Sequence, residues 1–436
     1  MLLNGVNNIY SLHRIRISRA CHPICIRWRG VPAADRLNIM SPPSLLLTLN
    51  AGSSSLKFGV YEPDPALNPV ASGQVVRIGG NSVLTVTPNQ AECSLVPVNQ
   101  ALGPVSHSGA VDAMLNWLGR FLAGRPVMAV SHRVVHGGPA LAEPIRLDAA
   151  AMDRLADWIP LAPLHQPFNL AGIRAAREAF PDAVQVACFD TAFHRHHDFV
   201  TDAFALPRQL YDAGIRRYGF HGLSYEFIAR RLQVRHPVLH GGRVVVAHLG
   251  NGASMCALRS GRSMASTMGF SALDGLPMGT RCGQLDPGVL LYLMEHERMD
   301  AHALRDLLYH ESGLKGLSGL SHDVRELTAS DSPRAREALA YFANRCRREI
   351  GALAACLEGI DGLVFTGGIG EHSAEVRAMI LSGMNWLGIE WDPQSNIQHE
   401  TVISSPESRV RVLVIPTDEE RMLAEHACQL LGLRVS

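Results

Sequence analysis

The sequence predicts an α/β protein built from two related halves. Short apolar runs of strand length alternate with segments of helical periodicity along most of the 436 residues. Turns rich in glycine follow several of these runs, as in α/β proteins that hold ligands at strand ends. One pattern of strand, turn and strand also returns about 200 residues after its first occurrence.

Two hairpins carry the signs of duplication. The first joins the apolar runs 45–49 and 58–61 through a turn that begins at Asn50. The second joins 244–249 to an apolar stretch ending at Leu258, through the turn GNGAS. Turns with Asn and Gly are also the commonest hairpin signal, so chance is the alternative interpretation. If the halves are duplicated, their boundary falls near residue 190.

Other segments complete the α/β pattern. Strand-like runs cover 183–188 and 363–366, and the second enters the turn GGIGE. Glycines between a strand and a helix let backbone N–H groups approach a phosphate closely. Helical periodicity predicts helices over 111–123, 150–158, 169–179, 223–233, 334–358 and 418–432.

Composition argues against several kinds of partner. Lysine plus arginine and aspartate plus glutamate both total 40, so no net charge favours nucleic acid or an anionic membrane. The nine cysteines include no C-x-x-C pair of the kind that binds zinc. No apolar run approaches the roughly 18 residues of a membrane-spanning helix. These features predict a cytoplasmic protein that binds neither nucleic acid nor membrane.

The first 43 residues differ from the rest. They contain six arginines between positions 14 and 36 and show little periodicity. A transit peptide can have this composition. Because strand-like sequence begins at Leu45 and Met40 is a plausible start, we expect a disordered or mis-started extension over 1–43.

The first hairpin turn could bind an anion. It reads NAGSSSLK over 50–57, which gives three hydroxyls, an amide and a lysine in eight positions. A polar surface hairpin is the alternative. The turn lacks the G-x-x-x-x-G-K-[ST] spacing of a phosphate-binding P-loop, so a nucleotide would have to be held in another way.

Three charged or titratable residues in the first half are candidates for a site. Arg133 lies in an apolar strand, where it needs either an ion-pair partner or an anionic ligand. Asp190 follows the run 183–188 at a strand end, although a helix N-cap would explain it equally well. His165 lies between prolines, which is also compatible with a purely structural role.

The second half adds His221, between glycines, and Arg281, in a long loop rich in glycine and proline. Loops of this length and composition are often functional. The segments 321–325 and 416–420 contribute carboxylates beside turn residues. The neighbouring histidines at 194, 196 and 197 have no partner cluster, so we do not expect them to bind a metal.

Eight segments together resemble the acetate kinase family of short-chain carboxylate kinases. They are NAGSSSLK, SHRVVHGG, FDTAFH, RRYGFHG, HLGNG, MGTRCG, VFTGGIGEHS and VIPTDEE, between Asn50 and Glu420. The resemblance implies a two-domain, duplicated ribonuclease H-like fold, as in sugar kinases, actin and heat-shock ATPases. Its domains would be 44–189 plus 417–436, and 190–416. It also implies a homodimer that moves the ATP γ-phosphoryl group reversibly to acetate.

The resemblance assigns catalytic roles that suit phosphoryl transfer, which requires in-line alignment and cancellation of charge. Arg133 and Arg281 would bind the carboxylate and the moving phosphoryl group. His221 would stabilise the transition state, with His165 in support. Asp190 would orient an arginine or the waters of a metal ion.

Binding roles are implied as well. Mg²⁺, or Mn²⁺ in its place, would lie near Asn50 and Glu419. A pocket for the methyl group of acetate would be lined by Val135, Leu164, Phe220 and Ala272. ATP or ADP would contact Ser54, Lys57, His248, Leu249, Gly250, Asn251, Gly252, Asp323, Val324, Arg325, Gly368, Ile369, Gly370, Glu371 and His372.

The chain departs from the family pattern in three places. Ala272 replaces the pocket proline of the common Thr-Pro-Leu-Glu-Gly segment, which could admit an extra methylene and make propionate or butyrate the preferred acid. Gln284 stands where the family usually has Asp, and HHD at 196–198 replaces a more typical Thr-Met-Pro. An actin-like or chaperone-like ATPase is a more distant alternative.

Overall fold

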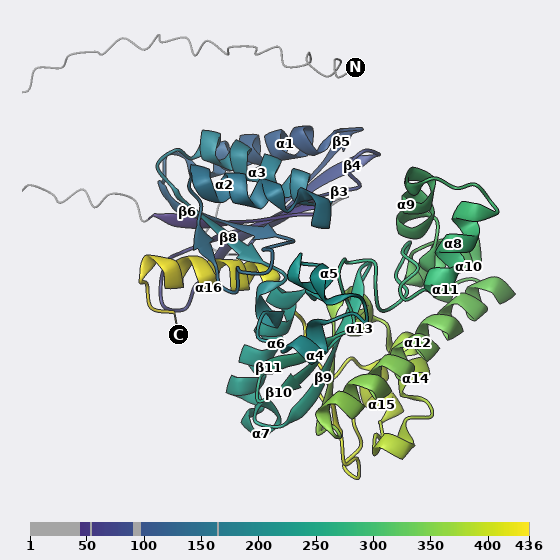
Figure 1. Cartoon of the computed structure of the whole chain (residues 1–436). Helices are drawn as coiled ribbons and strands as arrows, with labels where there is room; N and C mark the ends of the chain where they lie inside the picture. Colours follow the sequence, from purple (N-terminus) through teal and green to yellow (C-terminus); the bar gives the residue numbers. More distant parts are fainter. Residues whose placement is uncertain (1–43, 53–54, 90–96, 164, 436) are drawn as a thin grey trace, which may run out of the picture. The chain divides into compact units, whose positions relative to one another are not determined.

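The structure is a computed structural model that describes residues 44–52, 55–89, 97–163 and 165–435 (Figure 1). The N-terminal extension expected over 1–43 lies outside these residues. Strands and helices alternate as the sequence predicts, and each of the six expected helices begins and ends within a few residues of its predicted limits. Among the described residues, no helix is long and apolar enough to cross a membrane.

The first sheet has the strand order β5-β4-β3-β2-β1-β6-β8-β7. Strands β1, β2 and β3 form an antiparallel meander, whereas β6 runs parallel to β1 and β8 runs parallel to β6. The strands are β1 (Leu45–Ala51), β2 (Ser55–Tyr61), β3 (Pro69–Val76), β4 (Ser82–Pro88), β5 (Val98–Gly103), β6 (Val127–Val134), β7 (Ile145–Arg146) and β8 (Val184–Phe189).

The second sheet has the order β11-β10-β9-β12-β13. Its central strand β9 is a run of β-branched and other apolar residues that is covered on both faces. The strands are β9 (Arg243–Leu249), β10 (Ala253–Arg259), β11 (Arg262–Ser266), β12 (Gly362–Thr366) and β13 (Arg411–Val414).

The two sheets repeat one topology. In each, a central strand pairs on one side with an antiparallel hairpin partner, followed by a third antiparallel strand, and on the other side with two successive parallel strands. The series β3-β2-β1-β6-β8 therefore corresponds to β11-β10-β9-β12-β13. This correspondence confirms the duplicated, ribonuclease H-like architecture, and it identifies the repeated hairpin of the sequence as the same element in two copies.

Helices cover both faces of each sheet. The helices are α1 (His107–Leu122), α2 (Ala149–Asp157), α3 (Gln166–Ala179), α4 (Phe199–Asp202), α5 (Arg208–Asp212), α6 (Gly222–Arg235), α7 (Pro237–His240), α8 (Pro287–Glu295), α9 (Ala301–His310), α10 (Gly313–Ser318), α11 (Val324–Thr328), α12 (Pro333–Leu357), α13 (Gly367–His372), α14 (Ala374–Leu381), α15 (Pro393–Ile397) and α16 (Glu419–Leu431). Helices α1 and α3 lie on one face of the first sheet and α16 on the other, while α12 packs on the second sheet (Figure 1).

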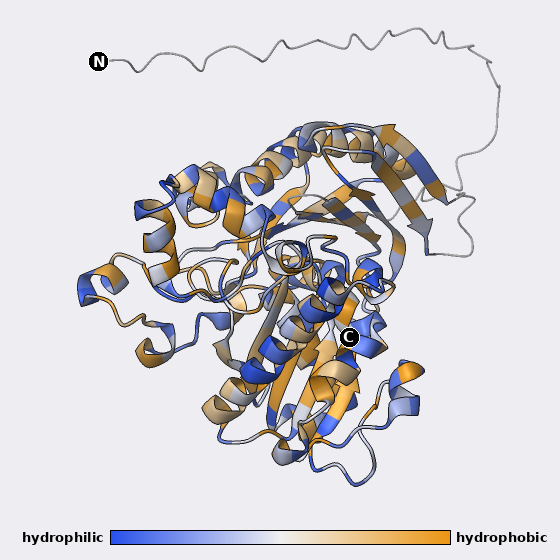
Figure 2. Cartoon of the chain, turned by 90° about the vertical axis from the view of Figure 1, so that its right-hand side faces the viewer, coloured by the Kyte–Doolittle hydropathy of each residue, from blue (hydrophilic) through white to orange (hydrophobic). Residues whose placement is uncertain are grey.

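One hydrophobic core spans both sheets. Apolar side chains of α6 and α16 pack together with residues of the first sheet, such as Leu46 and Val186, and of the second, such as Val246 and Leu413. Figure 2 shows the strands largely in hydrophobic colours, with hydrophilic residues on the outer faces of helices. Burial of this apolar surface fixes the two hairpins near each other, because α6 and α16 begin beside them.

Candidate active site

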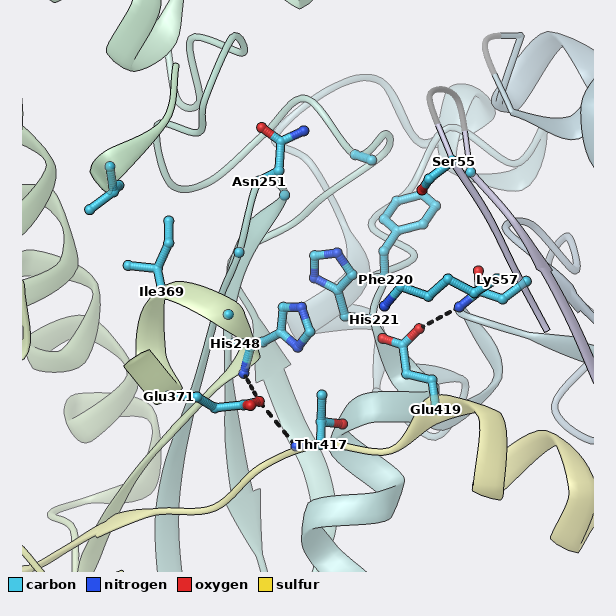
Figure 3. Close-up of a pocket in the computed structure, with 18 of the residues that line it drawn as sticks. Ser55, Lys57, Phe220, His221, His248, Asn251, Ile369, Glu371, Thr417 and Glu419 are labelled. Atoms are coloured by element: carbon cyan, nitrogen blue, oxygen red, sulfur yellow. Dashed lines mark hydrogen bonds between the residues drawn. The ribbon is translucent and has the colours of Figure 1, made fainter. Parts of the chain in front are cut away.

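A pocket of about 1000 Å³ is lined by residues from both hairpins and from the loops that follow the central strands. Figure 3 shows side chains from the two halves of the sequence converging on it. The predicted site residues that line it are Asn50, Lys57, Arg133, Val135, His165, Asp190, Phe220, His221, His248, Gly250, Asn251, Gly252, Ala272, Arg281, Asp323, Val324, Arg325, Gly368, Ile369, Glu371, His372 and Glu419.

Arg133 and Asp190 form the central ion pair. The Arg133 Nε donates to both carboxylate oxygens of Asp190, at 2.9 and 3.1 Å, and one terminal nitrogen lies 2.6 Å from Oδ2. The other terminal nitrogen donates to Asn50 Oδ1 at 3.1 Å. Burial lowers the pKa of Arg133, but the carboxylates of Asp190 and Glu419 more than offset this and raise it. Asp190 is therefore a partner that orients Arg133 rather than a helix N-cap.

The N-terminus of α16 brings an acidic pair beside this arginine. The Asn50 Nδ2 donates to Glu419 at 3.1 Å and to Glu420 at 3.3 Å. Asp418 caps the helix by accepting from the Arg421 backbone N–H. Burial acts to raise the pKa of Glu419, but Arg133 opposes it and the net pKa is lowered, whereas burial raises the pKa of Glu420. Glu419 is thus the more readily ionised of the two.

Arg281 differs from Arg133 because it has no ionic partner. Its guanidinium donates to the Ala272 carbonyl at 2.9 Å, and within the described part of the chain no carboxylate pairs with it. Burial lowers its pKa. Beside it, burial and the charges of the two arginines lower the pKa of His165 to about 3. A half-buried guanidinium that has no carboxylate partner among the described residues, next to a neutral imidazole, is well suited to bind an anion.

His221 lies at the start of α6 with a left-handed backbone, at a φ of 58°. Such a conformation is uncommon for a residue with a side chain and often marks a functional site. Its ring stacks on that of His248, with centroids 4.4 Å apart (Figure 3). Burial lowers the pKa of both histidines, and for His221 the neighbouring His248 and arginines lower it further. Both rings are therefore neutral at neutral pH.

The glycine-rich segment after β12 closes the far side of the pocket. Glu371 accepts from the backbone N–H groups of Gly367, at 2.8 Å, and Thr417, at 3.1 Å (Figure 3). Gly367 has a φ of 75°, and a Cβ there would lie 2.8 Å from the Leu249 carbonyl oxygen. A side chain could therefore not occupy this position, so the glycine permits the close approach of α13 to the second hairpin.

The Acetokinase family model matches residues 45–425 of the chain. The chain belongs to this family. It is 54% identical to the acetate kinase of Methylocella silvestris over 394 residues, which cover 88% of this chain and 98% of the relative. It is 51% identical to the acetate kinase of Rhizobium meliloti over 388 residues, 89% and 98% of the two chains.

Solved structures of kinases share the fold. A propionate kinase from Francisella tularensis superposes with a TM-score of 0.81 at 33% identity and covers 88% of this chain and 98% of that one. The acetate kinase of Porphyromonas gingivalis gives 0.77 at 36% identity, with 89% and 100% covered. These likenesses, with the duplicated sheets, identify the fold and the kinase class of this acetokinase family member.

Two predicted nucleotide contacts do not line the pocket of this acetokinase family chain. Leu249 is fully buried in the core, because side chains alternate along β9 and only His248 faces the pocket. Gly370 is buried on the side of α13 that faces Phe365 and Ala247. Ser54 and Leu164 lie outside the described residues.

The structure also brings in residues that the sequence did not single out. Asn169 of α3 accepts from the Val135 N–H at 3.0 Å and donates to the Ala51 carbonyl at 2.9 Å, so it ties β6 to the first hairpin. Ser254 and Ser224 bind the Nδ1 atoms of His221 and His248, each at 2.8 Å. The signal that could have identified these residues is their polar character within apolar elements. Their partners could not be found this way, because they are more than 20 residues away in sequence.

The departures from the acetokinase family pattern have structural explanations. Gln284 accepts a hydrogen bond from Arg345 of α12, so it makes a loop contact away from the pocket. His197 lies 3.2 Å from Asp202 and 2.8 Å from Ser263. Asp198 caps α4 by accepting from the Thr201 N–H at 2.9 Å. The segment at 196–198 is therefore structural, and its histidine bonds are to a carboxylate and a hydroxyl.

Ala272 lies where the main pocket meets a second, smaller hollow of about 10 Å³. Val135, His165, Phe220 and Ala272 line both spaces. The hollow is completed by Leu161, Ala162, Pro163, Ser271 and Tyr309. A volume of this size is on the scale of one small group.

Proposed function

We propose that this protein is an acetate kinase that transfers the γ-phosphoryl group of ATP reversibly to acetate, giving acetyl phosphate and ADP. One observation carries the proposal: a single pocket joins a half-buried arginine that has no carboxylate partner among the described residues, an oriented arginine and two neutral histidines to two hairpins whose turns can hold phosphates. Such a donor set matches a carboxylate and a phosphoryl group together, which is more than activation of water requires.

The two arginines have different roles. Arg281, which has no carboxylate partner in the described chain, is available to neutralise the acid or the moving phosphoryl oxygens. Asp190 holds the guanidinium of Arg133 in one orientation, so the directions of its remaining N–H groups are fixed. His221 and His165 are neutral, so they add hydrogen-bond donors without placing more positive charge beside the guanidinium groups.

Magnesium fits the acidic end of the pocket. Glu419 and Glu420 supply carboxylate oxygen atoms of the kind that Mg²⁺ or Mn²⁺ prefers, and the lowered pKa of Glu419 keeps its carboxylate charged. When bound, the ion would offset charge on the phosphates. Asn50 joins this end to Arg133, since its Oδ1 accepts from the arginine while its Nδ2 donates to the glutamates.

ATP would lie along the part of the pocket that is lined by the second half of the chain. We propose that the hairpin turn at 250–252 and the segment at 368–372 approach its phosphates, and that Asp323, Val324 and Arg325 approach the adenosine part. The first hairpin would contribute Lys57, whose side chain is exposed and lines the pocket.

Propionate is a second candidate substrate. The wall at Ala272 lacks the ring of the family proline, and the small hollow beside it offers space next to the methyl site. An extra methylene contributes about 1–3 kcal/mol to discrimination at such a site. We expect acetate to be used best and propionate to be used measurably.

Carboxylate-dependent ADP formation tests both statements. We expect release of ADP to require acetate and a divalent cation, and kcat/KM to fall from acetate to propionate to butyrate. A propionate value well above that of acetate would make the chain a propionate kinase. ATP hydrolysis at a rate indifferent to all three acids would point to an actin-like or chaperone-like ATPase instead.

Three further parts of the proposal concern the whole molecule. We propose two domains, 44–189 plus 417–436 and 190–416. The strands of the first sheet all lie in 44–189, and those of the second sheet all lie in 190–416. We also propose a homodimer in the cytoplasm, where ATP is available. Light scattering of the purified protein would test the dimer, and cell fractionation the location.

A further inference from the structure

A chain of three polar groups lies behind the candidate active site. His221 Nδ1 is 2.8 Å from Ser254 Oγ, and the Tyr225 hydroxyl is hydrogen-bonded to the same oxygen. Tyr225 and Ser254 are fully buried. Within the residues that the structure describes, Ser254 is the only hydrogen-bond partner of the Tyr225 hydroxyl.

The partners fix the direction of the protons. Because Tyr225 has no other acceptor there, its proton has to point at Ser254 Oγ. The serine proton is then free to point at His221 Nδ1, which must accept it as an unprotonated nitrogen. The reverse order would leave the tyrosine proton buried without an acceptor, which costs about 1–3 kcal/mol.

The other ring nitrogen of His221 lies near the pocket residue Gly252. A Cβ built on Gly252 would lie 3.3 Å from His221 Nε2 and 3.9 Å from a terminal nitrogen of Arg281. Nε2 therefore lies near the turn of the second hairpin and on the side of Arg281. If Nδ1 accepts a proton from Ser254, the neutral ring carries its own proton on Nε2.

We propose that Tyr225 and Ser254 are positioning residues that hold neutral His221 as its Nε2–H tautomer, so that it donates a hydrogen bond to the phosphoryl group in transfer. The inference rests on the proposed kinase function. The opposite tautomer would present a lone pair to a phosphoryl oxygen, and the two would repel each other. A hydroxyl relay thus supplies a neutral donor where another positive charge would crowd Arg133 and Arg281.

The first test is kinetic. Ser254→Ala removes the group that binds Nδ1, so we expect kcat to fall about 10- to 100-fold. Tyr225→Phe leaves the serine free to rotate, so we expect a fall of about 3- to 10-fold. KM for ATP and acetate should change less than about twofold in both, since neither residue contacts a substrate. The double variant should be no slower than Ser254→Ala, because both residues act through one chain.

Tyr218→Phe is the matched control. Tyr218 is also a buried tyrosine with one hydrogen bond, from its hydroxyl to the Gly214 carbonyl at 2.7 Å, and it is outside the relay. We expect its kcat to match that of the unaltered protein. A fall in kcat equal to that of Tyr225→Phe would show that loss of any buried hydroxyl in this region is enough, and would overturn the proposal.

The second test reads the tautomer directly and does not depend on turnover. In protein labelled with ¹⁵N-histidine, two-bond nitrogen–proton correlations distinguish a ring protonated at Nε2 from one protonated at Nδ1, and His221→Asn identifies the signals. We expect Nε2–H for His221 in the unaltered protein and a mixture in Ser254→Ala. An Nδ1–H signal in the unaltered protein, or no change in the variant, would contradict the relay. Absence of carboxylate-dependent activity would refute the proposed function alone.

Discussion

The two hairpins occupy equivalent positions in the two sheets, but they present different chemistry to the pocket. In the first, Asn50 and Lys57 are cross-strand partners, and Asn50 joins Arg133 to the carboxylates of α16. In the second, His248 and Ser254 are cross-strand partners, and they lie among hydroxyl and imidazole groups. The first hairpin therefore lies beside charged groups, and the second lies beside neutral hydroxyl and imidazole groups.

This difference shows how the two copies of a duplicated fold can place different chemical groups around one pocket. Charged groups can be buried beside the first hairpin because each has a partner of opposite sign. Beside the second hairpin, Glu419 and Glu371 act to raise the pKa of His248, but burial outweighs them, and burial also lowers the pKa of His221, so both histidines stay neutral. The following predictions test the division, beginning with the largest expected effect.

Replacing either arginine should abolish most activity, but only one replacement should destabilise the fold. We expect Arg133→Ala and Arg281→Ala each to lower kcat/KM by at least about 10³-fold, the lower end of the effect of an arginine in phosphoryl transfer. Arg133→Ala also leaves the buried Asp190 carboxylate without its ion-pair partner, so it should lower the free energy of unfolding by about 3–5 kcal/mol.

Coupled assays and denaturant unfolding measure these two effects. Arg281→Ala should keep nearly the original unfolding free energy, since its guanidinium bonds to a carbonyl and to no carboxylate in the described chain. A near-normal rate for either variant would refute the role proposed for that arginine.

Glu419→Gln should weaken the metal dependence. The carboxylate of Glu419 is the more readily ionised of the acidic pair, so its loss should raise the Mg²⁺ concentration for half-maximal activity about 10- to 100-fold. Glu420→Gln is the matched control and should raise it less. Removal of divalent cations with a chelator should abolish activity. Equal effects of the two variants would contradict the assignment of Glu419.

Acid should destabilise the protein through histidines that are buried in the neutral form. Burial lowers the pKa of His132 to about 4 and of His136 and His194 to about 3, from 6.5 in the unfolded chain. The unfolded state therefore binds more protons in this range, so stability is full above about pH 6.5 and falls as the pH falls toward 4. Each histidine contributes a slope of up to about 1.4 kcal/mol per pH unit.

Thermal unfolding as a function of pH measures this slope. His132→Gln keeps a hydrogen-bond donor beside Gln185 but cannot titrate, so it should make the acid limb shallower. The same slope in the variant would show that His132 titrates with its ordinary pKa. Because His221 is also neutral, we expect kcat to show no inflection near pH 6.5.

Ala272→Pro should produce the smallest effect. Filling the wall next to the small hollow should raise the preference for acetate over propionate about tenfold, with little change in kcat for acetate. Ratios of kcat/KM for the two acids measure it. An unchanged ratio would place the determinant of acid length elsewhere in the pocket.

Most of the elements could be predicted from the sequence, because local signals specify them. A run of apolar β-branched residues predicted β9, and helical periodicity predicted α12. The approach of a phosphate to the glycines after β12 stays a prediction, whereas the structure shows that Gly367 lets α13 pack closely against Leu249. Both hairpins were predicted at nearly their observed limits. Residue type and position singled out candidates such as Arg133, Asp190 and Arg281, whereas their roles and most of the binding residues came from the family resemblance.

The sequence by itself therefore determined the order of strands and helices and the residue types available to the pocket. Only the tertiary structure decided their charge states and partners. Arg133 pairs with Asp190, 57 positions away, whereas Arg281 has no carboxylate partner among the described residues. Asn169 joins two segments that are both distant from it in sequence. The physical reason is that burial and through-space contacts set pKa values and hydrogen-bond directions, and neither follows from local spacing.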